Sequence, residues 1–253
     1  MSTSHLSETE HHRQVRGTHD APTATRGRAS KRDLYRAAVT GLSPSLLLVG
    51  LVYHPHVHDL RDKGAVAAAL VADTTRWGIA HVVVGVAAAL VLLAFLSVDE
   101  YLRESGQGET RAALGVPFIV LGSVLFAFLP AMEIAMLGAY GAGVDVEEVM
   151  LEMNSWFQPI LLAGAAVFAV GVAFFVVAIA RSRTLNGTLM WLVVAALVVV
   201  AVARFVPLGA ALYLGGAALV VALLPIAVAM VMHPSRDRKR GRRIFPTGPA
   251  EDY

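Results

Sequence analysis

The sequence predicts an all-α integral membrane protein with six transmembrane helices and short amphipathic helices on the outer face. Apolar residues make up 56% of the 253 residues, and the mean hydropathy is +0.62. These residues gather in stretches of about 20, the length that crosses the hydrocarbon core of a bilayer as a helix. Polar residues are confined to the chain ends and to short gaps, which is the composition of a membrane protein. The chain has no cysteine, so disulfides and thiolate metal ligands are excluded.

The first segment, Met1–Arg36, is polar and rich in Ser, Thr, Arg and His. It has too little apolar surface to offset the entropy of ordering, which predicts a disordered tail. We expect its four histidines to be solvated and not metal-bound; they are His5, His11, His12 and His19. No small-residue cleavage site follows this polar tail, so the first apolar stretch is expected to be a retained anchor.

Six apolar stretches follow as predicted spans. They are Ala37–Tyr53, Trp77–Val98, Leu114–Tyr140, Trp156–Ala180, Thr188–Val206 and Ala210–Met232. Together they form a membrane domain over residues 37–232, which a basic tail of residues 233–253 follows.

Two shorter apolar segments between the spans predict surface helices. Gly64–Ala72 is apolar but too short to cross a bilayer. Asp145–Met153 places its apolar residues at helical spacing, with Asp145 and Glu148 in capping-box positions. Ser155 and Gln158 have the same spacing and are expected to open the fourth span as a separate helix.

The distribution of positive charge predicts the orientation. With both termini in the cytoplasm, 17 of the 21 Lys and Arg residues lie on the cytoplasmic side. Positive charge is enriched in cytoplasmic loops, so we expect a multi-pass protein of the cell (inner) membrane with both termini inside. The basic run RDRKRGRR after the last span is expected to contact anionic lipid, with no role in nucleic-acid binding.

Four polar residues are predicted to share the outer leaflet. His54 ends the first span, His81 begins the second, Glu133 lies in the third, and Arg204 lies near the end of the fifth. Charged groups within spans are candidates for functional sites because burying them is costly. We expect Glu133 and Arg204 to pair, since a guanidinium matches a carboxylate. The alternative is that such a pair only fixes the register of the helices.

The segment HPHVH suggests a metal site. His54, His56 and His58 would point the same way in an extended segment, and Pro55 favours an extended conformation at His54. Three imidazoles near Asp59 would suit zinc or copper. Solvated loops contain the same alternation, so a plain loop is the competing interpretation.

The order of features resembles a family of uncharacterised six-span bacterial membrane proteins that is classed by a domain of unknown function. The residues that carry the resemblance are DTTRWGIAH, NSWFQPILLAG and RSRTLNGTLMWLV, and it extends over Leu42 to Met232. The resemblance implies a fold and a location, and it supplies no catalytic residues.

These patterns lead to a functional hypothesis. We expect a membrane protein with an outer-leaflet polar pocket that binds or transports a small solute or ion. A structural or accessory membrane subunit is the alternative, and an outer-facing metalloenzyme is the third. No phosphate loop, HExxH motif or nucleophile–base pair is present within the spans, so no catalytic residue is assigned and an enzyme is not the leading expectation.

Overall fold

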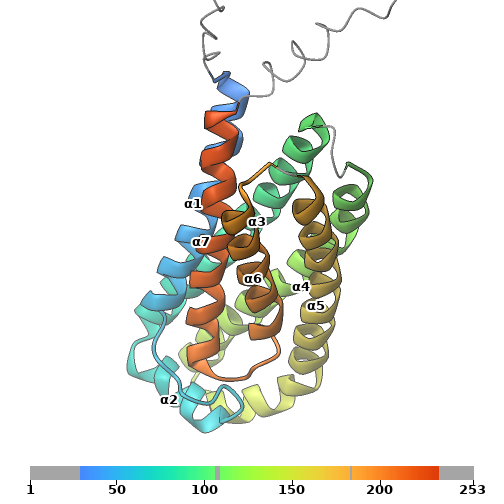
Figure 1. Ribbon diagram of the computed structural model, residues 1–253. Helices are drawn as coiled ribbons and strands as arrows, with labels where there is room; N and C mark the ends of the chain where they lie inside the picture. Colours follow the sequence, from blue (N-terminus) through green and yellow to red (C-terminus); the bar gives the residue numbers. More distant parts are fainter. Residues whose placement is uncertain (1–28, 106–108, 183, 234–253) are drawn as a thin grey trace, which may run out of the picture.

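The computed structural model describes residues 29–105, 109–182 and 184–233 (Figure 1). Most of the predicted N-terminal tail and nearly all of the basic C-terminal tail, including RDRKRGRR, lie outside the described residues. Within the described part the fold is helical, with a single isolated bridge between Asp59 and Leu208. The predicted all-α class is therefore confirmed.

Seven helices make up the described chain. They are α1 (Lys31–Tyr53), α2 (Lys63–Ala72), α3 (Thr74–Ser105), α4 (Glu109–Gly141), α5 (Val146–Ser182), α6 (Gly187–Ala203) and α7 (Gly209–Met232). Among them α1, α3, α4, α5 and α7 are long and apolar enough to cross a membrane, whereas α6 is apolar but has 17 residues. The chain is thus a multi-pass membrane protein with at least five membrane-length helices in its described part.

Local signals explain where several helices begin. Ser30 and Asp33 form a capping box at α1, in which each side chain accepts from the other residue's backbone N–H. Asp62 caps α2 by accepting from Ala65 N at 3.0 Å, and Asn186 caps α6 by accepting from Leu189 N at 2.9 Å. The predicted helix at 64–72 is confirmed as α2.

The fourth span does not begin at Ser155 as predicted. Asp145 caps α5 through the backbone N–H groups of Glu147 and Glu148, and the helix then runs without a break to Ser182. Ser155 lies inside it and donates its hydroxyl to the carbonyl of Glu152 at 3.0 Å. The amphipathic segment and the span form one helix because Val146 and Met150 already face the buried end of the bundle.

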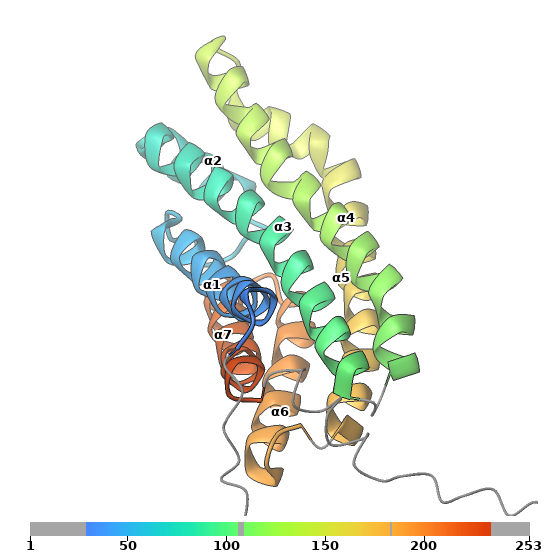
Figure 2. The ribbon, with the colours of Figure 1, turned by 90° about the horizontal axis from the view of Figure 1, so that it is seen from above.

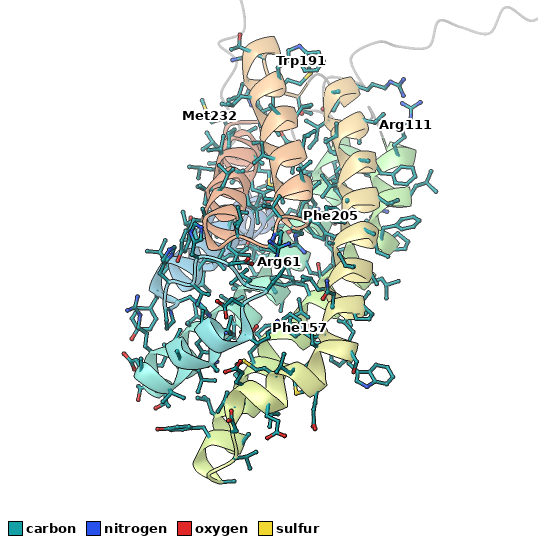
Figure 3. All side chains as sticks on the ribbon, turned by 90° about the horizontal axis from the view of Figure 1, so that it is seen from below. Arg61, Arg111, Phe157, Trp191, Phe205 and Met232 are labelled. Carbon is teal, nitrogen blue, oxygen red and sulfur yellow. The ribbon has the colours of Figure 1, made fainter. Side chains whose placement is uncertain are left out.

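The six longer helices form a closed ring. Each packs against its neighbours in the order α1, α3, α4, α5, α6, α7 and back to α1, and Figure 2 shows this arrangement along the bundle. The start of α1 and the end of α7 lie at the same end of the bundle (Figure 1). Trp191 and Arg111 lie towards that end, while Arg61 and Phe157 lie in the opposite half (Figure 3).

Aromatic packing and glycines hold the ring together. Phe95 of α3 meets Phe168 and Phe175 of α5 edge to face, with ring centroids 5.7 and 5.0 Å apart. A Cβ on Gly122 of α4 would lie 2.7 Å from the backbone nitrogen of Phe168, so only glycine permits this approach of α4 and α5.

A second apolar cluster closes the end of the bundle opposite the start of α1 and the end of α7. It draws on α2, the loop before it and the adjacent ends of α3, α4 and α5, and its buried members are Val57, Val66, Ala67, Leu70, Trp77, Met136, Val146 and Met150. The loop before α2 also contacts the α6–α7 connection, where Leu60 N donates to Pro207 O and Gly209 N donates to His58 O. The candidate site lies beside this cluster.

Candidate metal centre

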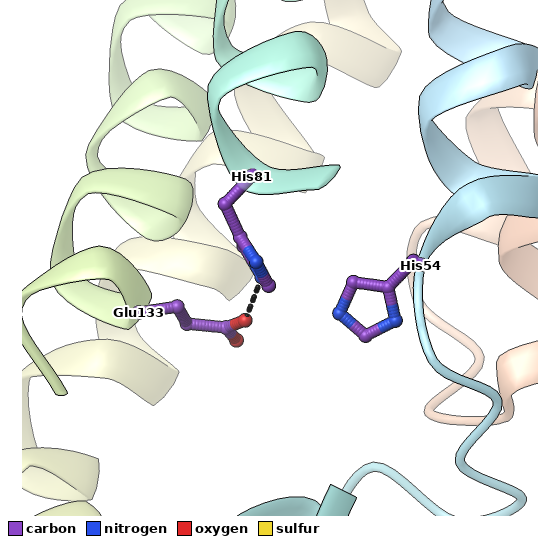
Figure 4. A group of neighbouring side chains, drawn as sticks. All are labelled: His54, His81 and Glu133. Atoms are coloured by element: carbon purple, nitrogen blue, oxygen red, sulfur yellow. Dashed lines mark hydrogen bonds and ion pairs between the residues drawn. The ribbon is translucent and has the colours of Figure 1, made fainter. Parts of the chain in front are cut away.

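The centre begins with a pair of side chains from two helices. His81 of α3 and Glu133 of α4 form a hydrogen bond between the imidazole Nε2 and a carboxylate oxygen (Figure 4). The His81 side chain is 6% exposed and that of Glu133 is 24% exposed. Both residues lie within membrane-length helices, where a charged group is costly unless it has a partner. Each relieves that cost for the other.

Trp77 fixes the position of this pair. The Nδ1 atom of His81 lies 2.7 Å from the backbone carbonyl oxygen of Trp77, one turn earlier in α3, and donates to it. The indole nitrogen of Trp77 donates to the backbone carbonyl of Glu133 at 3.3 Å. Trp77 is fully buried, so it ties α3 to α4 directly beside the pair. From the sequence, Trp77 is only the first residue of the second predicted span; its position four residues before His81 was the signal for this further role.

His54 approaches from a third element. It is the C-cap residue of α1, with φ −58° and ψ 139°, the extended conformation that Pro55 imposes on the residue before it. Its Nδ1 donates to the carbonyl of Pro55 at 2.6 Å. Its ring lies 4.8 Å from those of Trp77 and His81, centroid to centroid. Its second ring nitrogen faces His81 and Glu133 (Figure 4).

These three residues offer two imidazole nitrogens and a carboxylate oxygen that lie within 4.8 Å of one another. In a tetrahedral zinc site with bonds of about 2.0–2.1 Å, neighbouring ligand atoms lie roughly 3.3 Å apart. His54 would therefore have to approach by about 1–1.5 Å, whereas the hydrogen-bonded atoms of His81 and Glu133 would have to separate slightly to admit an ion; small side-chain rotations can supply both changes. Two nitrogens and one oxygen are a donor set that zinc and related divalent transition metals accept.

The orientation of both imidazoles supports this donor set. Histidines that bind a metal through one ring nitrogen usually donate the other N–H to a carbonyl or carboxylate, which fixes the tautomer. His54 and His81 both direct Nδ1 to a backbone carbonyl, so Nε2 is the nitrogen that each can offer to an ion. Two independent backbone contacts thus aim the imidazoles at one point.

The HPHVH segment does not gather its own histidines. His56 instead lies over Tyr213 of α7, with a hydrogen bond of 3.3 Å to the phenol oxygen. In the described residues, the group with three possible ligands close together is His54, His81 and Glu133, and it includes neither His56 nor His58. The three side chains do not converge, because the His54 ring packs on Trp77 and His81 whereas the His56 ring packs on Tyr213.

Asp59 is also engaged elsewhere. Its carboxylate accepts from the backbone N–H of Arg61 at 3.0 Å and from the Nε of the same residue at 3.2 Å. The side-chain hydrogen bond from Arg61 holds the pKa of the Asp59 carboxyl below its ordinary value. Asp59 therefore forms part of a local loop contact and not of the metal centre.

The predicted pairing of Glu133 and Arg204 is corrected by the structure. Arg204 follows α6, and its guanidinium carbon lies 3.8 Å from the ring centroid of Phe168 and 4.6 Å from that of Phe126. Its Nη1 atom is buried and has no hydrogen-bond partner among the described residues. Glu133 pairs with His81 because α4 packs beside α3, whereas α6 packs between α5 and α7. Of the four predicted polar residues, three converge and Arg204 does not.

Comparison of the chain with family models, curated proteins and solved structures gives no match. The resemblance to six-span bacterial membrane proteins of unknown function therefore stays a prediction, and the site is interpreted from its own geometry.

Proposed function

We propose that this membrane protein binds a small divalent transition-metal ion, zinc being the best-suited example, between His54, His81 and Glu133. The observation that carries the proposal is that the ligand atoms of the three side chains converge, with both histidines oriented by hydrogen bonds to backbone carbonyls. The ion would take the place of the proton that His81 Nε2 shares with Glu133. The Glu133 carboxylate would offset part of the positive charge of the ion.

The coordination suits an ion that exchanges. Structural zinc sites are closed by four protein ligands, whereas three ligands leave a position open to water or substrate. Among the described residues the group offers three ligands, and Glu133 remains partly exposed. An exchangeable ion at the end of a bundle of membrane-length helices favours a role for the protein in ion transport, with ion binding as its first step.

The test is zinc binding by the full-length protein in lipid nanodiscs, measured by calorimetry. A background that carries alanine at the tail histidines removes binding outside the described residues; the positions are His5, His11, His12 and His19. We expect one tight zinc per chain in this background, and a loss of affinity of at least tenfold in each of His54→Ala, His81→Ala and Glu133→Gln. In proteoliposomes, zinc-dependent uptake that the same substitutions abolish would extend binding to transport.

His56→Ala and His58→Ala are the matched controls, because they change the same loop and leave the three ligands intact. Wild-type affinity in both would place the ion at the proposed centre. If His56→Ala or His58→Ala abolishes binding while His81→Ala does not, the HPHVH segment is the site and the proposal fails.

The competing function is a structural or accessory subunit in which His81 and Glu133 only hold α3 against α4. The hydrogen bonds from His81 to Glu133 and from Trp77 to the backbone of Glu133 favour this reading equally. In that case, Glu133→Gln lowers the thermal stability of the protein, and the unaltered protein binds no zinc.

The proposed topology has six crossings, with α6 as the shortest, in the inner membrane and with both termini cytoplasmic. Three observations support it: the six longer helices form a closed ring, the start of α1 and the end of α7 lie at one end of the bundle, and positive charge is strongly biased to one side of the predicted spans. At 1.5 Å per residue α6 is about 25 Å long, a few ångströms short of the roughly 30 Å hydrocarbon core. The connection from Arg204 to Leu208 would complete this crossing.

A further inference from the structure

A groove opens on the outside of the bundle between α1 and the start of α3. Its volume is about 620 Å³, and its lining residues are Leu48, Val49, Val52, Tyr53 and Arg76. Val49 and Val52 are 61% and 60% exposed, on a helix that is long and apolar enough to cross a membrane. The wall of the groove is thus apolar and faces the surrounding lipid, with one cation at its end.

Arg76 is held in a fixed position at the mouth of this groove. Its Nε donates to the backbone carbonyl of Tyr53 at 2.6 Å, and its guanidinium lies 5.6 Å from the centroid of the Tyr53 ring. The first contact satisfies one of the carbonyls left open at the end of α1. Within the described part of the chain, the hydrogen bond of the Arg76 side chain is made by Nε, so Nη1 and Nη2 remain available to a ligand.

The charge around Arg76 favours an anion. The nearest acid along the chain, Asp73, accepts from the backbone N–H of Arg76 at 2.9 Å as it caps the start of α3. Its charge is therefore offset by the positive end of the helix. Arg61 at the same end of the molecule is paired with Asp59, so the charge that the groove itself presents is that of Arg76.

We propose that this groove binds one phospholipid, with its phosphate on the guanidinium of Arg76 and an acyl chain along Leu48, Val49 and Val52. A guanidinium binds a phosphate through two parallel hydrogen bonds, and Arg76 has the two terminal nitrogens that this geometry needs. Arg76 is in the first turn of α3, where the head groups of a bilayer lie, and the apolar wall continues from there towards the middle of α1. Charge and shape thus call for the same ligand class, a phosphate joined to a hydrocarbon chain.

The proposal is tested by native mass spectrometry of the full-length protein titrated with phosphatidylglycerol in detergent. Arg76→Gln removes the cation, and Val52→Trp fills the groove from its apolar wall. We expect each substitution to lower the affinity for the first bound phosphatidylglycerol by about tenfold. Arg76→Gln removes the charge-assisted hydrogen bonds to the phosphate, and Val52→Trp blocks the apolar wall that the acyl chain contacts. Diacylglycerol, which has the same chains and no phosphate, should bind weakly to the wild type and be unaffected by Arg76→Gln.

The controls separate this groove from general lipid contact. Arg61→Gln removes an exposed cation at the same end of the molecule, and Val198→Trp enlarges an exposed side chain on α6. Both should retain wild-type binding, and all variants are compared after their melting temperatures show that they are folded. Equal retention of phosphatidylglycerol by wild type and Arg76→Gln, or equal binding of diacylglycerol and phosphatidylglycerol, overturns the proposal. If Arg76→Gln unfolds, the result with Val52→Trp decides whether the proposal stands, and wild-type binding of phosphatidylglycerol by Val52→Trp overturns it.

Discussion

At the scale of single residues, Glu133 and Arg204 are stabilised in the bundle by different means. Glu133 has a hydrogen-bonding imidazole, whereas Arg204 has two aromatic faces and one unpartnered nitrogen. A cation between two rings gains about 2 kcal/mol or more when it is desolvated, which offsets part of the cost of burying it. Arg204 therefore needs no carboxylate to remain in the bundle.

The separate environments of Glu133 and Arg204 predict independent effects on stability. Phe126, which Arg204 contacts, lies seven residues before Glu133 on α4, about 10 Å along the helix. We expect Glu133→Gln to cost about 1–3 kcal/mol through the weakened bond to His81. We expect Arg204→Met to change stability by about 1 kcal/mol or less, because methionine keeps the aromatic contact and removes a buried charge.

The measurement is a double-mutant cycle on unfolding in detergent or lipid. The free energies of the two substitutions should add to within about 0.5 kcal/mol. A coupling energy of several times that size would mean that the two groups interact, against the contacts described above. Arg204→Lys is a useful control, since lysine keeps the charge and loses the flat face that stacks on the rings.

At the scale of helices, small residues decide which faces meet. Gly122 and Gly171 lie where α4 and α5 approach most closely, and a Cβ on Gly171 would lie 2.8 Å from the backbone nitrogen of Ile119. At the opposite end from the candidate metal centre, the Arg36 side chain of α1 donates to the carboxylates of Glu100 and Glu104 of α3 at 2.8 Å each. That contact was missed from the sequence, although two glutamates four residues apart form one face of a helix.

The close approach of α4 and α5 predicts a sharp cost for a larger side chain. Gly122→Leu should destabilise the protein by about 3 kcal/mol or more, because backbone atoms of Phe168 cannot move aside as a side chain would. Gly138→Leu is the matched control on the same helix, since nothing lies within 4 Å of a Cβ at that position. Melting temperatures of the two variants in the same detergent provide the comparison. Equal losses would mean that α4 and α5 are not in contact through Gly122.

At the scale of the whole molecule, the closed ring brings the loops after α1 and α6 together at one end. Two backbone hydrogen bonds join these loops, and the second apolar cluster packs beside them. The ends of α1, α3 and α4 meet there as well, which is why residues 27 and 52 positions apart in the chain form one centre. The candidate metal centre is thus a product of the ring and not of any one segment.

The ring and the charge bias together predict the position of the C-terminus. A reporter that is active only in the cytoplasm should be active when fused after Tyr253 and when fused before Met1, because the six crossings that we propose return the chain to its starting side. A fusion after Ala142, in the connection between α4 and α5, should be inactive. An inactive C-terminal fusion in a membrane-inserted protein would mean that α6 does not cross.

The sequence alone determined the all-α membrane class and the short helix α2, and it singled out His54, His81 and Glu133 as polar residues at the spans. These follow from composition, from the length of apolar runs and from the cost of polar groups within them, all of which are local properties.

The tertiary structure decided which polar groups meet. Depth along a helix can be counted from the sequence, but the direction in which a side chain points depends on which helices are neighbours. The structure therefore placed Glu133 against His81, Arg204 between two phenylalanines and His56 over Tyr213. It also merged the predicted amphipathic helix into α5, because the apolar faces of both parts point to the same core.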